Sequence, residues 1–240
     1  EVHVSQGLPS LTIVGLAEAA VRESKDRVRS AIINSGFQFP TKRLTINLAP
    51  ADLPKDGSRL DLPIALGILM ASGQIPEHAT DQLEFIGELA LDGQLRPITG
   101  ILSIAIACQQ SGHQLILPEQ NAPEASQLPQ FEVFAAQHLK DVCEHLSKQQ
   151  PIAQYQPQTT TTVDQYKFDL ADVKGQLRPR RALEIAAAGG HSLLFKGPPG
   201  TGKTLLASRL ASILPPLNMQ ENLEVARIYS VANTAHSFGQ

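Results

Sequence analysis

The chain has 240 residues, of which 42% are hydrophobic and 18% charged, a balance typical of globular proteins that bury a core. It contains no run of about 18 apolar residues, which excludes a hydrophobic membrane-spanning helix. The formal net charge of −3 is unevenly spread. Residues 1–148 carry 11 lysines and arginines against 17 aspartates and glutamates, and residues 149–240 carry 9 against 6. Neither part has the strongly basic character of a stand-alone DNA-binding domain.

The cysteines and histidines are too widely spaced to indicate a metal site or a disulfide. We interpret Cys108 and Cys143 as buried thiols of a protein kept in the reducing cytoplasm. The first residues lack the basic and apolar regions of a signal peptide. Because the chain does not begin with methionine, we expect it to be a fragment or a processed product.

Composition divides the chain into two blocks. Residues 149–166 are rich in glutamine, threonine and proline, which bury little apolar area and favour extended backbone, and they predict a linker. The linker separates an N-terminal block, residues 1–148, from a C-terminal block, residues 167–240.

Strand and helix patterns alternate in the N-terminal block, which predicts a mixed α/β domain. In chain order we expect a strand at 11–15, a helix at 18–35, a strand at 43–48, a helix at 62–72 capped by Asp61, a β-hairpin with strands within 84–91 and 94–98 around Asp92-Gly93, a helix at 101–110, a strand at 114–117 and a helix at 139–146. The stripe of Val21, Val28, Ala31 and Ile32 is expected to face the core.

The C-terminal block is predicted to place a strand between helices. We expect a helix at 176–188, a buried strand at 192–196, a helix at 203–214 ended by Pro215-Pro216, and a further helix through Tyr229 capped by Asn218.

A phosphate-binding loop stands between that strand and the next helix: Gly197-Pro198-Pro199-Gly200-Thr201-Gly202-Lys203-Thr204. Its glycines allow backbone N–H groups to approach phosphate closely, and the following helix would add its positive end. Lys203 is expected to reach the β- and γ-phosphates, and the Thr204 hydroxyl to hold Mg²⁺. The motif in this context predicts binding of ATP with Mg²⁺.

Hydrolysis of ATP needs a second, acidic motif that holds Mg²⁺ and positions water. The 36 residues after Thr204 contain no apolar strand ending in Asp-Glu. We therefore expect the chain to stop inside its ATPase domain, and to bind ATP without hydrolysing it on its own.

The approach to the loop resembles the start of an AAA+ module of the magnesium-chelatase branch. The resemblance rests on Asp172-Val-Lys-Gly-Gln176, the following helix and the loop itself. It implies that Val173, Gly175 and Gln176 help to enclose the adenine. The arginines of the helix, Arg178, Arg180 and Arg181, are compatible with a solvated face or with a nucleotide or subunit contact.

The N-terminal block resembles the proteolytic domain of Lon, through Leu53-Pro-Lys-Asp-Gly57 and the segment 87–100. This resemblance places Arg59 at the position of Lon's nucleophilic serine and Leu102 at that of its catalytic lysine. Neither side chain can do that chemistry, so a Lon-like domain without its dyad is expected. Ser58 and Lys55 remain as ill-placed candidates for peptidase activity, against the alternative of a charged loop for structure or partner contact.

A Lon-like domain followed by a chelatase-type AAA+ module resembles the YifB and ComM family of Mg-chelatase-like ATPases. The predicted fold class is thus α/β, with a Lon-like α+β domain before the beginning of a P-loop domain. The resemblance implies a hexameric ring that remodels DNA by branch migration during competence. Three alternatives stay open: a chelatase-type ATPase acting on metal insertion or on proteins, an ATP-dependent peptidase, and an N-terminal block that binds another protein.

Overall fold

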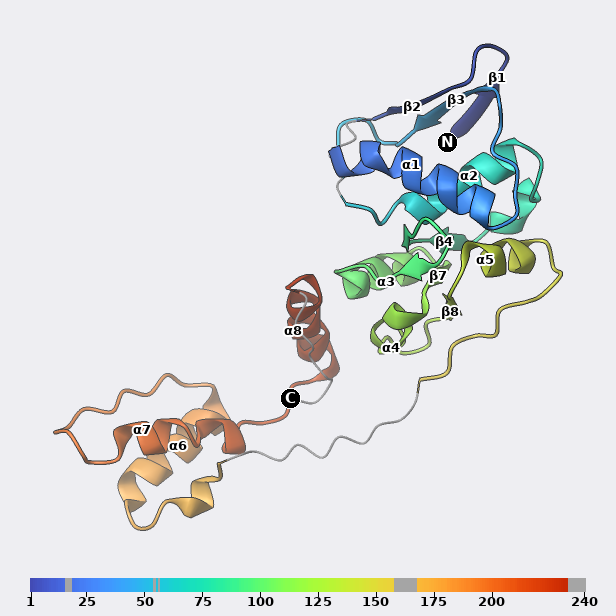
Figure 1. The fold of residues 1–240 in the computed structure, drawn as a ribbon. Helices are drawn as coiled ribbons and strands as arrows, with labels where there is room; N and C mark the ends of the chain where they lie inside the picture. The colour runs from blue at the N-terminus through green and yellow to red at the C-terminus, as the bar shows by residue number, and fades with distance from the viewer. Residues whose placement is uncertain (16–18, 54, 56, 158–167, 233–240) are drawn as a thin grey trace. The chain divides into compact units, whose positions relative to one another are not determined.

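The computed structural model describes residues 1–15, 19–53, 55, 57–157 and 168–232 (Figure 1). By its internal contacts the chain forms two compact units. Unit 1 comprises Glu1–Thr159 with Arg227–Ala235, and unit 2 comprises Thr160–Ala226 with His236–Gln240. Among the described helices, none is long and apolar enough to cross a membrane.

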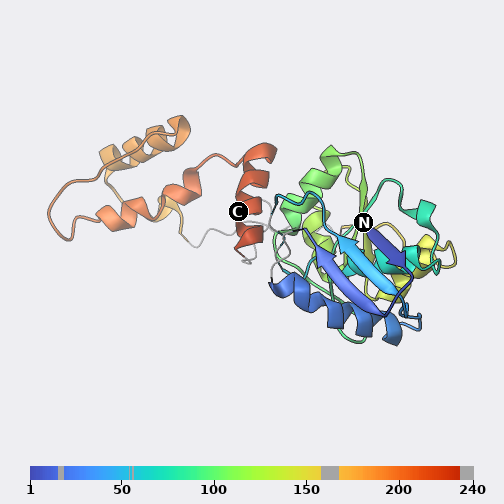
Figure 2. The same cartoon turned by 90° about the horizontal axis from the view of Figure 1, so that it is seen from above.

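Unit 1 begins with a three-stranded sheet built from β1 (Val2–Ser5), β2 (Ser10–Val14) and β3 (Arg43–Asn47). The order is β1-β3-β2, in which β3 pairs antiparallel with β1 and parallel with β2. Helices α1 (Ala19–Asn34) and α2 (Asp61–Ala71) lie together against this sheet, and the view from above shows α1 running alongside the strands (Figure 2).

A second, fully parallel sheet has the order β4-β7-β8, with β4 at Leu83–Phe85, β7 at Gln114–Pro118 and β8 at Val133–Ala136. A two-stranded hairpin, β5 (Glu88–Leu89) with β6 (Leu95–Arg96), lies between β4 and the next helix in sequence. The remaining elements are helices: α3 at Ile101–Gln110, α4 at Ala122–Ala125, α5 at Leu139–Leu146, and the 3₁₀ turns η1 at Glu77–Thr80 and η2 at Glu119–Asn121.

The main core of unit 1 joins both sheets to their helices. The predicted stripe of α1 is confirmed, because Val21, Val28, Ala31 and Ile32 are all buried in it. They pack with Leu44 and Ile46 of β3 and with the apolar face of α2, while Leu139, Val142 and Leu146 of α5 close the cluster from the second sheet. This cluster packs α1, α2 and α5 against strands of both sheets. Ile101, Leu102 and Ala105 of α3 are buried as well, outside this cluster.

The first residues of the expected linker pack on unit 1. Ile152 lies against the main core, and its N–H donates to Nδ1 of His145 at 2.9 Å. Gln154 bridges Phe134 in antiparallel fashion, and the Tyr155 N–H donates to the Val133 carbonyl at 2.8 Å. These contacts place residues 152–155 along the outer edge of β8, so an edge strand that would otherwise be open is covered.

The structure corrects three expectations for unit 1. Asp61 does not cap α2: the N-cap is Leu60, and the Asp61 carboxylate faces the interior, where it pairs with Arg27. The expected strand at 84–91 is two strands, since β4 joins the parallel sheet and only β5 joins the hairpin. Two strands, β1 and β8, were not predicted, because each is short and gains its stability from pairing with a neighbour that is distant in sequence. The start of the helix expected at 18–35 falls partly outside the described residues.

Unit 2 is helical in its described part. It contains the 3₁₀ turns η3 (Leu170–Asp172) and η4 (Leu210–Ile213), with α6 at Leu177–Gly189, α7 at Lys203–Ala207 and α8 at Met219–Val231, whose last residues belong to unit 1. Its core is small, with Leu170, Val173, Leu183 and Leu206 buried and Phe195, Leu210 and Ile213 packed against them.

Two predictions for unit 2 are wrong. Residues 192–196 do not form a strand, and Leu194 is 88% exposed, because the described residues of this unit offer no second strand to pair with. The helix expected at 203–214 ends at Ala207. There the Ser208 hydroxyl bonds the Leu205 carbonyl, a local bond that competes with the helix, and the chain tightens into η4. The cap at Asn218 is confirmed, since its Oδ1 accepts from Glu221 N–H at 2.9 Å.

Candidate functional site

The phosphate-binding loop predicted at 197–204 joins the extended segment after α6 to the first turn of α7. Gly200 and Gly202 have φ angles of 81° and 77°. This left-handed conformation is unfavourable for residues with a Cβ, which explains why glycine stands at both positions. Nothing lies within 4 Å of the place a Cβ on Gly200 would take, so the loop is open on that side.

Lys203 folds back into the curve of the loop. Its Nζ donates to the carbonyls of Gly197 at 2.8 Å and Pro198 at 2.6 Å, and lies 3.4 Å from Oγ1 of Thr201. The Thr201 hydroxyl also donates to the Pro198 carbonyl, at 3.0 Å. The Nζ of Lys203 is therefore held at the centre of the loop, next to backbone that carries no Cβ at Gly197, Gly200 and Gly202.

This donor set fits a triphosphate with its magnesium ion. Lys203 and the N–H groups of the loop would hold phosphate oxygens, and Thr204, exposed on the first turn of α7, would present its hydroxyl to Mg²⁺. Because α7 has only five residues, its dipole is too short to be counted as a contribution. The residues expected to bind the phosphates are thus those of the loop itself.

The segment before α6 reaches the loop through one side chain. Gln176 donates from Nε2 to the Thr201 carbonyl at 3.4 Å, and a Cβ on Gly202 would lie 3.1 Å from the same nitrogen. Gly175 is exposed. Val173 is only 2% exposed and packs in the core with Leu206, so its side chain faces the interior. An adenine contact from Val173, Gly175 or Gln176 stays a prediction, and Gln176 is the one whose side chain is hydrogen-bonded to the loop.

The three arginines of α6 have different surroundings. Arg180 donates from Nη1 to the Val173 carbonyl at 3.3 Å and so supports the segment from behind. Arg181 forms an exposed ion pair with Glu184 at 2.9 Å, and Arg178 is exposed. Exposed pairs of this kind contribute little to stability, so the solvated-face interpretation suits Arg181 best.

The Lon-like positions in unit 1 do not come together as a catalytic dyad. Leu102 is completely buried in α3, while the backbone carbonyl of Arg59 accepts from Gly87 N–H at 3.0 Å. The Ser58 hydroxyl donates to a carboxylate oxygen of Glu88. Lys55 donates from Nζ to the Pro50 carbonyl. Ser58 is therefore hydrogen-bonded to a carboxylate rather than to the neutral amine that a Ser–Lys dyad needs.

Sequence reasoning missed an ion pair at the same place. Arg27 of α1 binds Asp61 with two bonds, Nε to Oδ2 at 2.8 Å and Nη2 to Oδ1 at 3.2 Å, and the Leu89 N–H donates to Oδ2 at 3.3 Å. The Asp61 side chain is 1% exposed. Burial raises the pKa of this carboxyl, although Arg27 and the Leu89 N–H act in the opposite direction. The pair joins α1, α2 and β5, and its members are too far apart in sequence to reveal each other.

The cysteine interpretation agrees with the structure as far as burial is concerned. Cys108 and Cys143 are both free and buried, and burial raises the pKa of each thiol to about 12. Among the residues that the structure describes, no cluster of three or more metal-ligating side chains occurs. Neither thiol is placed for chemistry.

Comparison with protein families and curated proteins adds independent information. A family model described as subunit ChlI of Mg-chelatase matches residues 1–121, and one described as magnesium chelatase, subunit ChlI, matches residues 169–240. The chain is 52% identical to the uncharacterized protein YifB of Salmonella typhimurium over 97% of its length, and 48% identical to the competence protein ComM of Haemophilus influenzae over 99%. It is also 30% identical to a Lon protease of Chloroflexus aurantiacus over 54% of this chain and 16% of the protease.

The chain spans less than half of the length of the relatives that it matches from end to end, 46% of the YifB protein and 48% of ComM.

Proposed function

The chain belongs to the family of Mg-chelatase subunit ChlI, in the group that includes YifB and ComM, and we propose that it is an ATP-binding subunit of an AAA+ motor. The observation that carries this proposal is the loop at 197–204, with Lys203 held at its centre and glycines at the two left-handed positions. The family consists of AAA+ ATPases, and nucleotide with Mg²⁺ is its general requirement.

Several finer points belong to the same proposal. Mg²⁺ is held by Thr204 and the nucleotide, and Gly175 and Gln176 lie at the adenine side. Hydrolysis takes place in the complete protein, which supplies the acidic motif that this chain lacks. The complete protein assembles as a hexameric ring in the cytoplasm.

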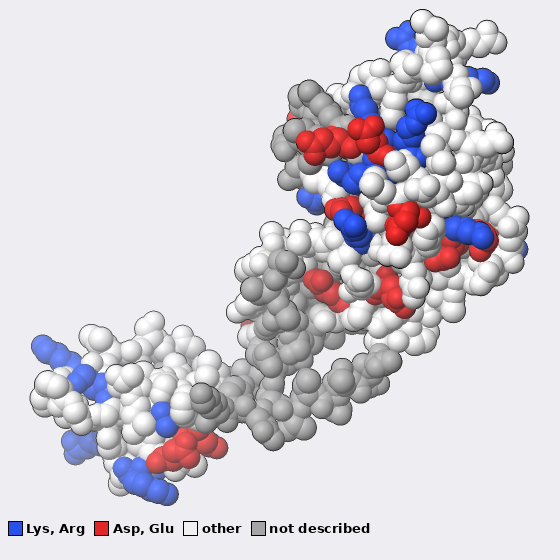
Figure 3. Space-filling model, in the orientation of Figure 1, with Lys and Arg blue, Asp and Glu red and all other residues white. Residues whose placement is uncertain are grey.

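DNA is the proposed substrate, remodelled by branch migration. Support comes from the name of the Haemophilus influenzae relative, a competence protein. The face of unit 1 in Figure 3 mixes acidic and basic side chains and carries no basic stripe. The proposal therefore does not rely on that face for contact with the phosphate backbone.

Nucleotide binding by this chain is the first test. Calorimetric titration with ATP and Mg²⁺ is expected to show binding that Lys203→Ala weakens at least about tenfold, since a charge-assisted contact to phosphate is lost. Lys140→Ala removes an exposed lysine that pairs with Glu144 and serves as the matched control. Equal affinity in the unaltered chain and in the Lys203 variant would rule the loop out as the phosphate site.

The substrate is tested on the complete protein. Its ATPase rate is measured with no DNA, with linear duplex and with branched DNA, each with the Lys203→Ala variant beside it. Stimulation by branched DNA that is lost in the variant supports DNA remodelling. Turnover that ignores every DNA would instead favour the second candidate function, a chelatase-type ATPase that drives metal insertion or acts on proteins, which the family description favours.

A peptidase is the least supported candidate. Ser58 is hydrogen-bonded to Glu88, and Leu102 occupies the position where Lon has its lysine. Casein cleavage that disappears in Ser58→Ala would restore this candidate, and we expect no cleavage.

A further inference from the structure

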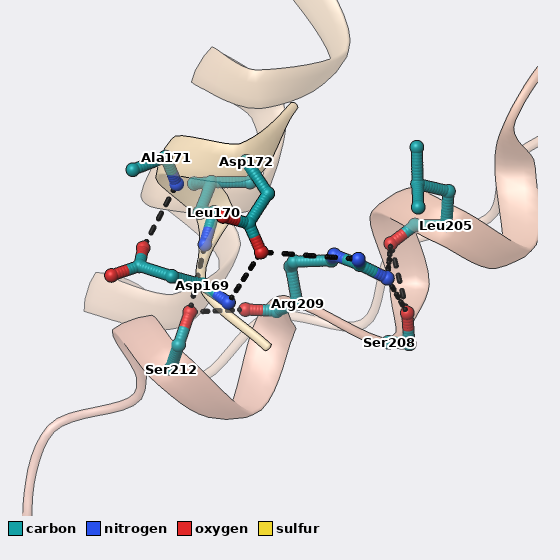
Figure 4. Close-up of polar contacts among 8 residues, drawn as sticks. All are labelled: Asp169, Leu170, Ala171, Asp172, Leu205, Ser208, Arg209 and Ser212. Carbon is teal, nitrogen blue, oxygen red and sulfur yellow. Dashed lines mark hydrogen bonds and ion pairs between the residues drawn. The ribbon is translucent and has the colours of Figure 1, made fainter. Parts of the chain in front are cut away.

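Residues 168–176 precede α6 and have little regular structure of their own. The only turn is η3, closed by a capping box in which Asp169 accepts from Ala171 N–H at 2.8 Å and Asp172 accepts from Asp169 N–H at 3.2 Å (Figure 4). Such a short turn does not fix its own position, so contacts with other parts of unit 2 must place it.

Arg209, five residues after Thr204, supplies two of these contacts. Its guanidinium lies over the ring of Phe168, with 4.5 Å from Cζ to the ring centroid, and Nη2 is 3.9 Å from Oδ2 of Asp172. On the other side Nη1 donates to the Ser208 hydroxyl at 2.8 Å and to the Leu205 carbonyl at 3.4 Å (Figure 4). One side chain thus joins the segment before α6 to residues 205–208, which follow the phosphate-binding loop.

The burial of Arg209 shows that this arrangement has a cost. The side chain is only 12% exposed, and Nε is buried with no hydrogen-bond partner among the described residues. A guanidinium keeps its charge in any such environment, and leaving a donor unsatisfied is unfavourable. The ring of Phe168 and the carboxylate of Asp172 offset that cost, and both belong to the segment that is held.

Two further contacts hold residues 168–176, one near each end. The Ser212 hydroxyl accepts from Leu170 N–H at 3.2 Å and donates to the Arg209 carbonyl at 2.8 Å. At the other end Gln176, with a φ of 50°, reaches the Thr201 carbonyl inside the loop. Residues 168–176 are therefore attached both to the loop, at Thr201, and to the residues beyond it, at Arg209 and Ser212.

We propose that Arg209 is a positioning residue for the base side of the nucleotide site. It holds residues 168–176 against residues 203–212, the stretch that begins with Lys203. Gly175 and Gln176 are thereby placed beside the loop before nucleotide binds. The inference rests on the proposed function, and it separates two contributions to affinity. Arg209 acts on the nucleoside end of the ligand, whereas Lys203 acts on the phosphates.

Two ligands distinguish these contributions: ATP and inorganic tripolyphosphate, each titrated with Mg²⁺ into the 240-residue chain. Arg209→Ala is expected to weaken ATP binding about tenfold, which corresponds to about 1.4 kcal/mol, and to change tripolyphosphate binding less than about twofold. Arg209→Lys keeps the charge near Asp172 without the planar stack on Phe168, and is expected to fall between. Lys203→Ala weakens both ligands, and Arg227→Ala, an exposed arginine of α8, weakens neither.

A milder variant guards against loss of folding. Ser212→Ala removes only the hydroxyl that bonds Leu170, and is expected to weaken ATP about threefold while sparing tripolyphosphate. Hydrogen exchange without any ligand is expected to quicken at Leu170 and Ala171 in both variants.

The outcomes separate the two proposals. Equal weakening of both ligands in the Arg209 and Ser212 variants shows a general loss of structure and overturns the positioning role, as does unchanged ATP affinity. If the unaltered chain binds neither ligand, the proposed function fails and this inference fails with it. If the unaltered chain binds both and Lys203→Ala loses both, any failure belongs to Arg209 alone.

Discussion

Unit 1 and unit 2 differ in how far their backbone is paired in sheets and how far their apolar side chains are buried. In unit 1 every named strand has a partner, and the core draws on both sheets and their helices. In the described part of unit 2 there is no strand, four residues are buried together, and Leu177 and Leu194 are largely exposed. A favourable local pattern therefore becomes a strand only where neighbouring strands are available to pair with it.

The ion pair between Arg27 and Asp61 offers the largest test of how strongly unit 1 is tied together. Asp61→Ala leaves a partly buried guanidinium and the Leu89 N–H without their shared partner, and is expected to cost about 3–5 kcal/mol. Urea denaturation followed by circular dichroism measures the loss. Glu184→Ala breaks an exposed pair in unit 2 and is expected to cost less than about 0.5 kcal/mol. Similar losses in the two variants would mean that burial does not distinguish the pairs.

Substitutions in the two cores test whether the units unfold separately. Leu69→Ala in α2 is expected to cost about 2–5 kcal/mol and to speed hydrogen exchange in peptides of unit 1. Leu183→Ala in α6 removes one of four buried core residues and is expected to act on peptides of unit 2. Exchange that rises in both units after either substitution would contradict independent folding.

The same comparison shows what the sequence could predict. Elements of unit 1 whose pattern is local were found, and α3 and α5 have the predicted bounds. Turn chemistry identified the hairpin, since Asp92-Gly93 closes β5 and β6. The strands β1 and β8 were missed because their stability comes from pairing across the chain.

At the candidate site, the loop could be predicted from the sequence because its motif lies in eight consecutive residues, and its binding of nucleotide stays a prediction. The contacts of Gln176 with Thr201 and of Arg209 with Phe168 join residues 25 or more positions apart, and no local pattern indicates them. The apolar side chain of Val173 lies in the core, and the adenine contact that a resemblance implies for this residue stays a prediction.

Glycine positions test how closely the hairpin of unit 1 is packed. A Cβ on Gly93, where φ is 94°, would lie 2.4 Å from Oγ of Ser35 and 2.6 Å from Cε1 of His138. Gly93→Ala is therefore expected to cost about 2–3 kcal/mol in thermal or urea unfolding. Gly112 has a φ of 72° with nothing within 4 Å, so Gly112→Ala carries backbone strain alone, about 1 kcal/mol. If the two substitutions lower the free energy of unfolding equally, the residues around Gly93 can shift to accommodate a Cβ.

The smallest expected effect concerns the place where unit 1 gives way to the chain that leads to unit 2. Burial lowers the pKa of His145, whose ring contacts Phe134 and whose Nδ1 accepts the Ile152 N–H. Because the folded state favours the neutral ring, this contribution to stability is complete above the unfolded pKa of about 6.5 and is lost as pH falls through the lower folded value.

Protonation of Nδ1 removes the acceptor, so the attachment of residues 152–155 to β8 is expected to weaken as pH falls from 7.5 to 5. Hydrogen exchange at Ile152 and Tyr155, corrected for its intrinsic pH dependence, measures this change. His145→Gln keeps an acceptor that does not titrate and is expected to remove the pH dependence. If the unaltered chain and the Gln variant follow the same pH curve, His145 does not control the attachment. The attachment of this segment would then depend on the packing of Ile152 and on the strand pairing of Gln154 and Tyr155.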